Sequence, residues 1–155
     1  MLSQLARLAP SESDLLLRAP LLVCILIAGA DNDIDRKEIR KAIDLANKSQ
    51  KKANSHLMEF YKVVGEDFED KLKVLIQSFP YEATQRNPLI TLDLQELNRV
   101  LPKIDKTIAV EYYQSLREIA QKIAESSGGL LGMKSIGNEE AKYVNLPMIT
   151  DPATS

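Results

Sequence analysis

Four carboxylates within residues 30–42 (ADNDIDRKEIRKA) have a spacing that suits a metal site. Asp31, Asp33 and Asp35 stand at alternate positions, and Glu38 follows three residues after the last of them. In an extended loop, side chains at positions i and i+2 point the same way, so the aspartates can converge. Carboxylate oxygens suit hard cations, which favours calcium or magnesium over zinc. These four residues are the candidate metal ligands of the chain.

The same stretch does not follow the EF-hand calcium loop. The three aspartates match the first, third and fifth positions of that template. Arg36 replaces the turn glycine at the sixth position, and Ala42 replaces the bidentate glutamate at the twelfth. Repulsion does not require a cation either, because two carboxylates about 5 Å apart in water repel by only about 0.8 kcal/mol. Four basic residues also balance the acids: Arg36, Lys37, Arg40 and Lys41.

A helix start is the alternative explanation for these acids. If Asp35 is the N-cap, Glu38 falls at the third helical position and completes a capping box. Ile34 and Ile39 then occupy the two positions of a hydrophobic staple. The two earlier aspartates would be loop residues that bond their own backbone. Both explanations stay open, and the residues by themselves favour a helix start without a metal.

The other reactive side chains do not indicate catalysis. Cys24 lies within the apolar run LLVCILIAGA, so we expect a buried, inert thiol. His56 is the only histidine, which leaves no second histidine for a nucleophile triad or a zinc site, and we expect it at a helix surface or edge. The glycine-rich stretch 127–132 lacks the GK[ST] ending of a phosphate loop and reads as a helix stop and connector. We therefore expect a protein that is not an enzyme.

The composition predicts one globular domain over residues 1–155, with 45% hydrophobic and 27% charged residues. A net charge of −2 gives no strong attraction to nucleic acid. The longest apolar segment, Ala19–Ala30, has 12 residues, whereas about 20 are needed to cross a bilayer. The N-terminus lacks a signal-peptide pattern, so we expect a cytoplasmic protein. A protein partner is expected, while homo-oligomer formation and peripheral membrane association stay open.

Apolar residues recur at helical spacing along nearly the whole chain, and no segment alternates as a strand would. This pattern predicts an all-α, compact bundle of about six or seven helices. We expect a core over about residues 15–146 and a loose tail at 150–155. Helices are expected over about residues 11–30, 36–64, 68–79, 94–101, 108–128 and 138–146, with 81–88 as the main loop.

Three local features refine this outline. Pro20 should kink the first helix or mark its true start. Residues 39–64 form either one long helix or two helices with a turn, and Gly65 should end them as a left-handed residue. Residues 25–39 and 119–141 share the order of apolar helix end, polar loop and new helix with a glutamate. This echo suggests two pseudo-symmetric helical hairpin halves.

The run IAGADNDIDRKEIRKA, followed later by ESSGGLLGMKSIGNEEA, resembles the TerB-like family of tellurite-resistance proteins over about residues 15–146. The resemblance implies a compact helical domain, a divalent-cation site at the four acids of residues 31–38, and a role in tellurite and chemical-stress responses. Asn32 stands where the family usually has glycine, and Ser127 where an aspartate would supply a matching ligand. The matching residues are Ala30, Asp31 and Glu38 in the first run, and Ser127, Gly128, Gly129, Leu131, Gly132, Ile136, Glu139 and Glu140 in the second.

Two hypotheses for the function follow. The first is a non-enzymatic, TerB-like helical module that binds a divalent cation at Asp31, Asp33, Asp35 and Glu38 and so fixes the angle between two helices for a partner to sense. The second is a metal-free scaffold for protein–protein interaction, in which the aspartates serve only as caps.

Overall fold

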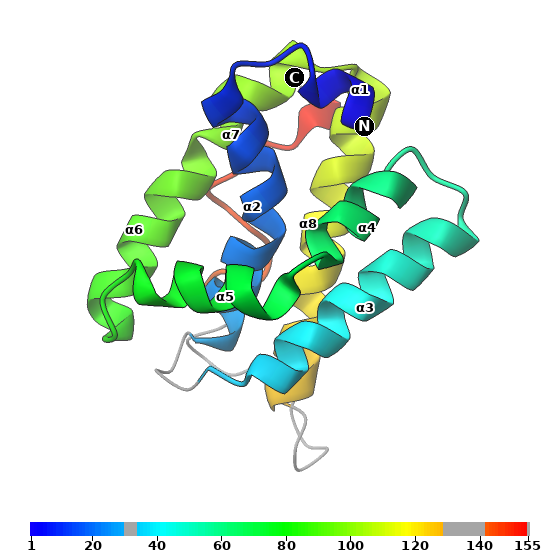
Figure 1. Cartoon of the computed structure of the whole chain (residues 1–155). Coiled ribbons are helices and arrows are strands. Elements are labelled where there is room, and N and C mark those ends of the chain that lie inside the picture. Colours follow the sequence, from blue (N-terminus) through cyan, green and yellow to red (C-terminus); the bar gives the residue numbers. More distant parts are fainter. Residues whose placement is uncertain (30–33, 129–141, 155) are drawn as a thin grey trace.

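The computed structural model describes residues 1–29, 34–128 and 142–154. Within these ranges every regular element is helical, which confirms the all-α class (Figure 1). Six helices of eight or more residues and two of four residues agree with the expected bundle of about six or seven. The elements are α1 (Leu2–Leu5), α2 (Pro10–Ala28), α3 (Arg36–Lys52), α4 (Met58–Gly65), α5 (Phe68–Gln77), α6 (Ala83–Gln95), α7 (Leu97–Val100) and α8 (Lys106–Gly128), with short 3-10 helices η1 (Leu101–Lys103) and η2 (Pro152–Thr154).

Helix α2 runs through the middle of the bundle and contacts α3, α4, α5, α6 and α8 (Figure 1). Twelve of its 19 residues are buried, and they lie on every face of the helix. A helix that is apolar all round is stable in water only when neighbours cover it on all sides, which explains its central place. Its first turn is set by Pro10 at the N1 position and by Glu12, whose Oε1 accepts from the Ala9 N–H at 3.0 Å.

Pro20 does not mark the start of this helix, because α2 continues through it. A proline has no backbone N–H, so the carbonyl of Leu16, four residues earlier, loses its usual helical donor. The Tyr112 hydroxyl of α8 donates to that carbonyl at 2.8 Å, and both side chains are fully buried. A long-range contact thus replaces the missing helical hydrogen bond.

We expect the substitution Tyr112→Phe to lower the free energy of unfolding by about 1–3 kcal/mol, because it leaves the buried Leu16 carbonyl unpaired. Urea unfolding followed by circular dichroism measures this loss. Adding Pro20→Ala restores an N–H that can donate to the same carbonyl, so the double variant should lose less than the sum of the single losses. Strict additivity would contradict the assigned role of Tyr112. Tyr113→Phe, at a neighbouring buried tyrosine, is the control.

Helices α3 and α4 are separate, so the two-helix alternative for residues 39–64 is correct. The turn between them contains Asn54, whose φ of 50° is left-handed. Gly65 is the last residue of α4, and the left-handed residue at this junction is Asp67, with φ 52°. The prediction of a left-handed Gly65 is therefore wrong. Asparagine and aspartate tolerate this conformation better than most side chains, which is why they stand at both turns.

The predicted main loop at residues 81–88 is mostly helical, because α6 begins at Ala83. Pro88 lies inside α6, and the carbonyl that it deprives of a donor belongs to Thr84, an exposed residue. Arg86 and Asn87 within this segment are buried, which the prediction of a loop did not indicate. The long-range hydrogen bond from Arg86 to the Gly29 carbonyl has overridden the local turn signals.

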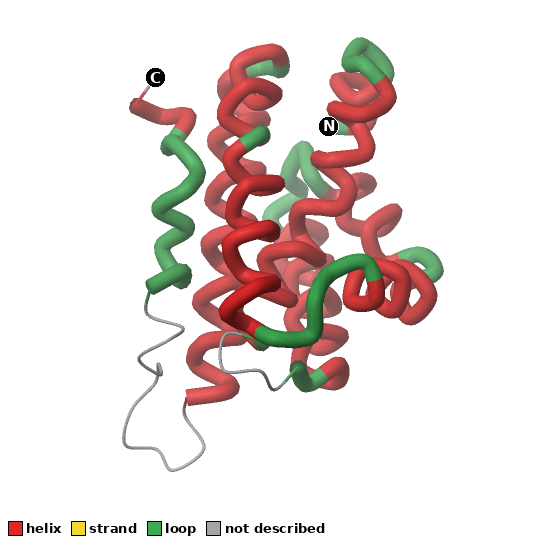
Figure 2. The backbone as a smooth tube through the Cα atoms, turned by 90° about the vertical axis from the view of Figure 1, so that its left-hand side faces the viewer, coloured by secondary structure: helices red, strands yellow, loops and turns green. Residues whose placement is uncertain are grey.

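The C-terminal segment also differs from the expectation. Residues 142–145 form turns instead of the end of a helix, and Leu146 has a left-handed φ of 50°. The segment runs back along the bundle, and both chain ends lie at the same end of the molecule (Figure 2). Asn98 holds it there, because its Nδ2 donates to the Met148 carbonyl at 3.0 Å and its Oδ1 accepts from the Thr150 N–H at 2.7 Å.

The core consequently reaches beyond residues 15–146. Met1 and Leu5 are buried at one end of the chain, and Met148 and Pro152 are buried at the other. Residues 151–154 form a turn and η2 that contacts α8, whereas the sequence predicted a loose tail. The second half of the internal echo lies largely at residues 129–141, outside the described ranges, so the pseudo-symmetry stays a prediction. None of the helices described is long and apolar enough to cross a membrane.

Candidate functional site

The structure describes half of the candidate metal site. Asp31 and Asp33 lie outside the described residues, whereas Asp35 and Glu38 lie within them. Asp35 is the N-cap of α3, and its Oδ1 accepts from the N–H of Lys37 at 2.9 Å and of Glu38 at 3.3 Å. This is the capping geometry expected from the sequence. Glu38 is half-buried in the first turn of α3.

The hydrophobic residues around this helix start also follow the expectation. Ile39 is fully buried, and Ile34 is partly buried against the same core. Within residues 1–29, 34–128 and 142–154, histidine, cysteine and acidic side chains gather nowhere in a group of three that could hold a metal ion. What the described residues show at this turn is therefore a well-formed helix start.

Asp35→Ala should lower the free energy of unfolding by about 1 kcal/mol, because two N–H groups of α3 lose their acceptor. Asp35→Asn should cost much less, since an asparagine side chain caps a helix about as well as aspartate. Thermal unfolding of both variants by circular dichroism provides the comparison. Equal losses for alanine and asparagine would show that the negative charge, and not the cap, supports this turn.

Arg86 contacts the end of α2 and was missed by the sequence prediction. Its side chain is only 2% exposed. Nη1 donates to the Tyr81 carbonyl at 2.8 Å, and Nη2 donates to the carbonyl of Gly29, the residue that ends α2. Burial lowers the pKa of the guanidinium from its ordinary value, yet an arginine stays protonated in proteins. Arg86 therefore ties the start of α6 to the end of α2.

Gly29 is required by this contact. A Cβ atom at position 29 would lie 2.5 Å from Nη2 of Arg86 and 2.9 Å from Cγ1 of Ile34. Both distances are shorter than non-bonded contacts allow, so any side chain there would displace the guanidinium. The end of α2 is fixed by a residue 57 positions away in the sequence.

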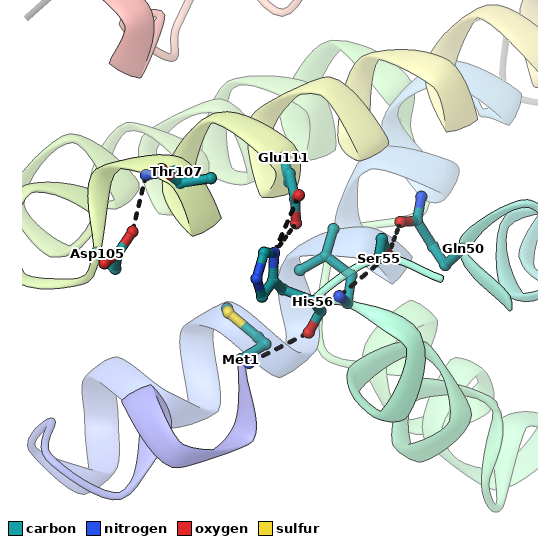
Figure 3. Close-up of polar contacts among 8 residues, drawn as sticks. Met1, Gln50, Ser55, His56, Asp105, Thr107 and Glu111 are labelled. Carbon is teal, nitrogen blue, oxygen red and sulfur yellow. Dashed lines mark hydrogen bonds and ion pairs between the residues drawn. The ribbon is translucent and has the colours of Figure 1, made fainter. Parts of the chain in front are cut away.

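His56 takes part in a polar network at the opposite end of α3 (Figure 3). Its side chain is 59% exposed, as expected, and Nδ1 lies 3.1 Å from both carboxylate oxygens of Glu111 on α8. The amino group of Met1 donates to the His56 carbonyl at 3.2 Å. Nearby, the Ser55 hydroxyl donates to Gln50 Oε1 and accepts from the Leu57 N–H. The network holds the α3–α4 turn against α8 and the N-terminus.

The thiol of Cys24 is fully buried in α2, and burial raises its pKa well above the usual range for a cysteine. A thiol held neutral and shielded from solvent is a poor nucleophile. This agrees with the expectation of an inert structural cysteine.

A groove of about 270 Å³, which we call the lysine groove, lies between α3 and α8. Its floor is apolar, whereas lysines stand along its edges. Within the ranges that the structure describes, these lysines form no ion pair. The lining residues are Ala42, Leu45, Ala46, Lys48, Ser49 and Lys52 from α3, and Glu118, Ile119 and Lys122 from α8.

Charge on α3 is distributed very differently from charge on the whole chain. The helix carries seven basic and two acidic residues, a surplus of five positive charges, whereas the whole chain has a net charge of −2. All seven basic side chains are exposed. From the sequence alone, Lys48, Lys51 and Lys52 are indistinguishable from an ordinary solvent-exposed helix face, because only the packing of α3 on α8 adds Lys122 and an apolar floor.

A second groove, of about 410 Å³, lies between α2, α4 and α5 and is mainly apolar. Val74 on its edge is 64% exposed, and Leu21 forms part of its floor. Its charged residues include both signs: Asp14 pairs with Arg18 at 3.3 Å, and Lys71 donates to the Val63 carbonyl at 2.9 Å. This groove therefore has no surplus of one charge with which to select a partner.

Comparisons of the chain with protein-family models, with curated proteins and with solved structures found no match. The fold and the surface geometry are thus the basis on which a function is proposed.

Proposed function

We propose that this protein is a TerB-like helical module that works by binding a protein partner and not by catalysis. The single observation that supports this most directly is the lysine groove. It combines an apolar floor with lysines that form no ion pair with any of the residues the structure describes. An apolar centre surrounded by a polar, solvent-accessible rim is the general arrangement of protein interfaces.

The arrangement of Asp35 fits the same proposal. Its Oδ1 is already engaged by two backbone N–H groups, which is the role of a cap in a metal-free scaffold. The motif residues that resemble the TerB-like family remain as additional, sequence-based support. In this proposal Asp35 stabilises the start of α3, and the surface between α3 and α8 binds the partner.

Selection from a random peptide library on the immobilised full chain tests the proposal. Peptides of about 16 residues span roughly four helical turns, enough to fill the groove. Enriched peptides should bind the protein in a fluorescence anisotropy titration and lose binding on Leu45→Glu, which places a charge on an exposed apolar position of the groove. Val74→Glu, at the second groove, is the matched control and should leave binding unchanged.

The result that would overturn the proposal is a set of repeated selections in which no enriched peptide depends on Leu45, or in which the enriched peptides depend on Val74 instead. Circular dichroism must first show that both variants melt like the parent protein. Since both side chains are substantially exposed, we expect changes in stability within about 0.5 kcal/mol.

A divalent-cation site at Asp31, Asp33, Asp35 and Glu38 is the second candidate function. The observation that favours it is that Asp35 uses only Oδ1 for capping, since Oδ2 makes no hydrogen bond with the described residues. Calorimetric titration with calcium, magnesium and zinc, up to about 1 mM, the weak end of protein calcium sites, tests it. Heat of binding that disappears in the double variant Asp31→Asn, Asp33→Asn would support the site. Flat titrations for all three ions would remove it.

A further inference from the structure

We propose that the lysine groove docks an acidic, amphipathic helix of a partner protein. This inference rests on the proposed function and adds the chemistry and conformation of the partner segment.

The floor of the groove is shaped for a helix. Ala42 and Ala46 stand one helical turn apart on α3, and both are buried, as is Ile119 of α8. Small side chains at successive turns leave a shallow channel between the two helices, into which the apolar side chains of a third helix can pack. Leu45 is 40% exposed beside this channel and offers a further apolar contact. Laying an apolar helix face into such a groove is a common mode of peptide recognition.

The cations are spaced for the polar side of such a helix. Lys48 and Lys52 are four residues apart on α3, so they lie slightly more than one helical turn, roughly 6 Å, from each other along its axis. Glutamates or aspartates four residues apart on a docked helix have the same spacing. Lys122 stands on the other wall of the groove, so cations from α3 and α8 flank the floor.

Glu118 is the one acid that lines the groove. Its Oε1 accepts a long hydrogen bond of 3.4 Å from the Ser49 hydroxyl. An acidic residue of the partner placed beside Glu118 would be repelled. The partner helix is therefore expected to carry its acids towards the three lysines and an uncharged or basic residue towards Glu118, which gives the complex one orientation.

The helix dipole does not account for all three lysines that line the groove, which are Lys48, Lys52 and Lys122. Cations in the last turn of a helix are stabilised by its dipole, and this explains Lys51 and Lys52. It does not explain Lys48, which precedes the last turn of α3, or Lys122 within α8. Nucleic acid is disfavoured because the floor is apolar and the chain is acidic overall. A membrane surface is a poorer match than a helix for a groove recessed between two helices.

The test uses the peptides selected on the full chain, with charge-reversal variants. Enriched peptides should have an excess of Asp and Glu, apolar residues at i, i+3 or i+4 and i+7, and should gain helical circular dichroism on binding. The double variant Lys48→Glu, Lys122→Glu should weaken binding at least about tenfold. Lys73→Glu, on an exposed lysine of α5 outside the groove, is the control and should leave affinity within about twofold.

The outcomes separate this inference from the proposed function. Peptides that depend on Leu45 but are neutral or basic, or whose affinity survives the double charge reversal, overturn the inference and leave the proposed function standing. Two parallel measurements address other occupants. Co-sedimentation with phosphatidylserine–phosphatidylcholine vesicles that is lost in the double variant, without acidic peptides, overturns it in favour of a lipid surface. A dimer in light scattering that becomes a monomer in the same variant overturns it in favour of a second copy of this chain.

Discussion

Replacing Arg86 with methionine is expected to lower the free energy of unfolding by about 2–4 kcal/mol. The guanidinium is buried and donates to the backbone carbonyls of Tyr81 and Gly29. Each hydrogen bond from a charged donor contributes about 1.5–3 kcal/mol, and removing both leaves two carbonyls without this donor. Part of the loss is offset, because methionine avoids the cost of burying a charge. Urea unfolding followed by circular dichroism measures the change. A lower midpoint concentration of urea reports lower stability if the m-value, the dependence of the free energy of unfolding on urea concentration, is unchanged.

Gln85→Met is the matched control, since Gln85 is the exposed neighbour of Arg86 on α6. Its effect should stay within about 0.5 kcal/mol, as for most surface substitutions. If the Arg86 variant were as stable as this control, the two hydrogen bonds would contribute nothing to the fold. Arg86→Lys should also be destabilising, because an ammonium group on a different stem cannot reproduce the planar fork of the guanidinium.

Phe60→Ala should have the largest effect of any substitution considered, a loss of about 3–5 kcal/mol. Phe60 of α4 is fully buried and makes edge-to-face contacts with two tyrosines. Its ring centroid lies 5.3 Å from that of Tyr61 and 5.6 Å from that of Tyr112. The substitution removes the burial of the ring, opens a cavity and loses both aromatic contacts.

Differential scanning calorimetry compares Phe60→Ala with Phe79→Ala. Phe79 is only partly buried at the edge of the core, so the same chemical change there should cost clearly less. Similar melting temperatures for the two variants would mean that the cluster of Phe60, Tyr61 and Tyr112 is not a centre of stability. Phe60→Leu should recover a large part of the loss, because it restores most of the buried apolar volume.

Features that depend on residues a few positions apart were predictable. Periodic apolar residues predicted most of the helices, because each helix in water must bury one face and the spacing of that face is written in the sequence. The apolar run around Cys24 predicted a buried thiol, and the spacing of Asp35 and Glu38 predicted the cap of α3. In each case the physical cause acts within about one or two helical turns.

The predictions that were wrong concern segments whose conformation depends on hydrogen bonds to residues far away in the sequence. Pro20 reads as a break, yet α2 continues through it and Tyr112 of α8 provides the missing donor. Residues 81–88 read as a loop, because nothing nearby shows that Arg86 is buried against Gly29. The C-terminal tail reads as loose, because its anchor is Asn98. Contacts of this kind leave no periodic signal in the sequence.

The sequence by itself determined the helical class, the central apolar helix and the start of α3, since helix propensity, apolar spacing and capping act within a few residues. Only the tertiary structure decided that α2 continues through Pro20 and which surface is suited to a partner. Lys48 and Lys122 belong to different helices, and they flank one apolar channel only because α3 packs along α8. A local pattern can define one face of a helix, whereas a groove needs two helices and the packing that brings them together.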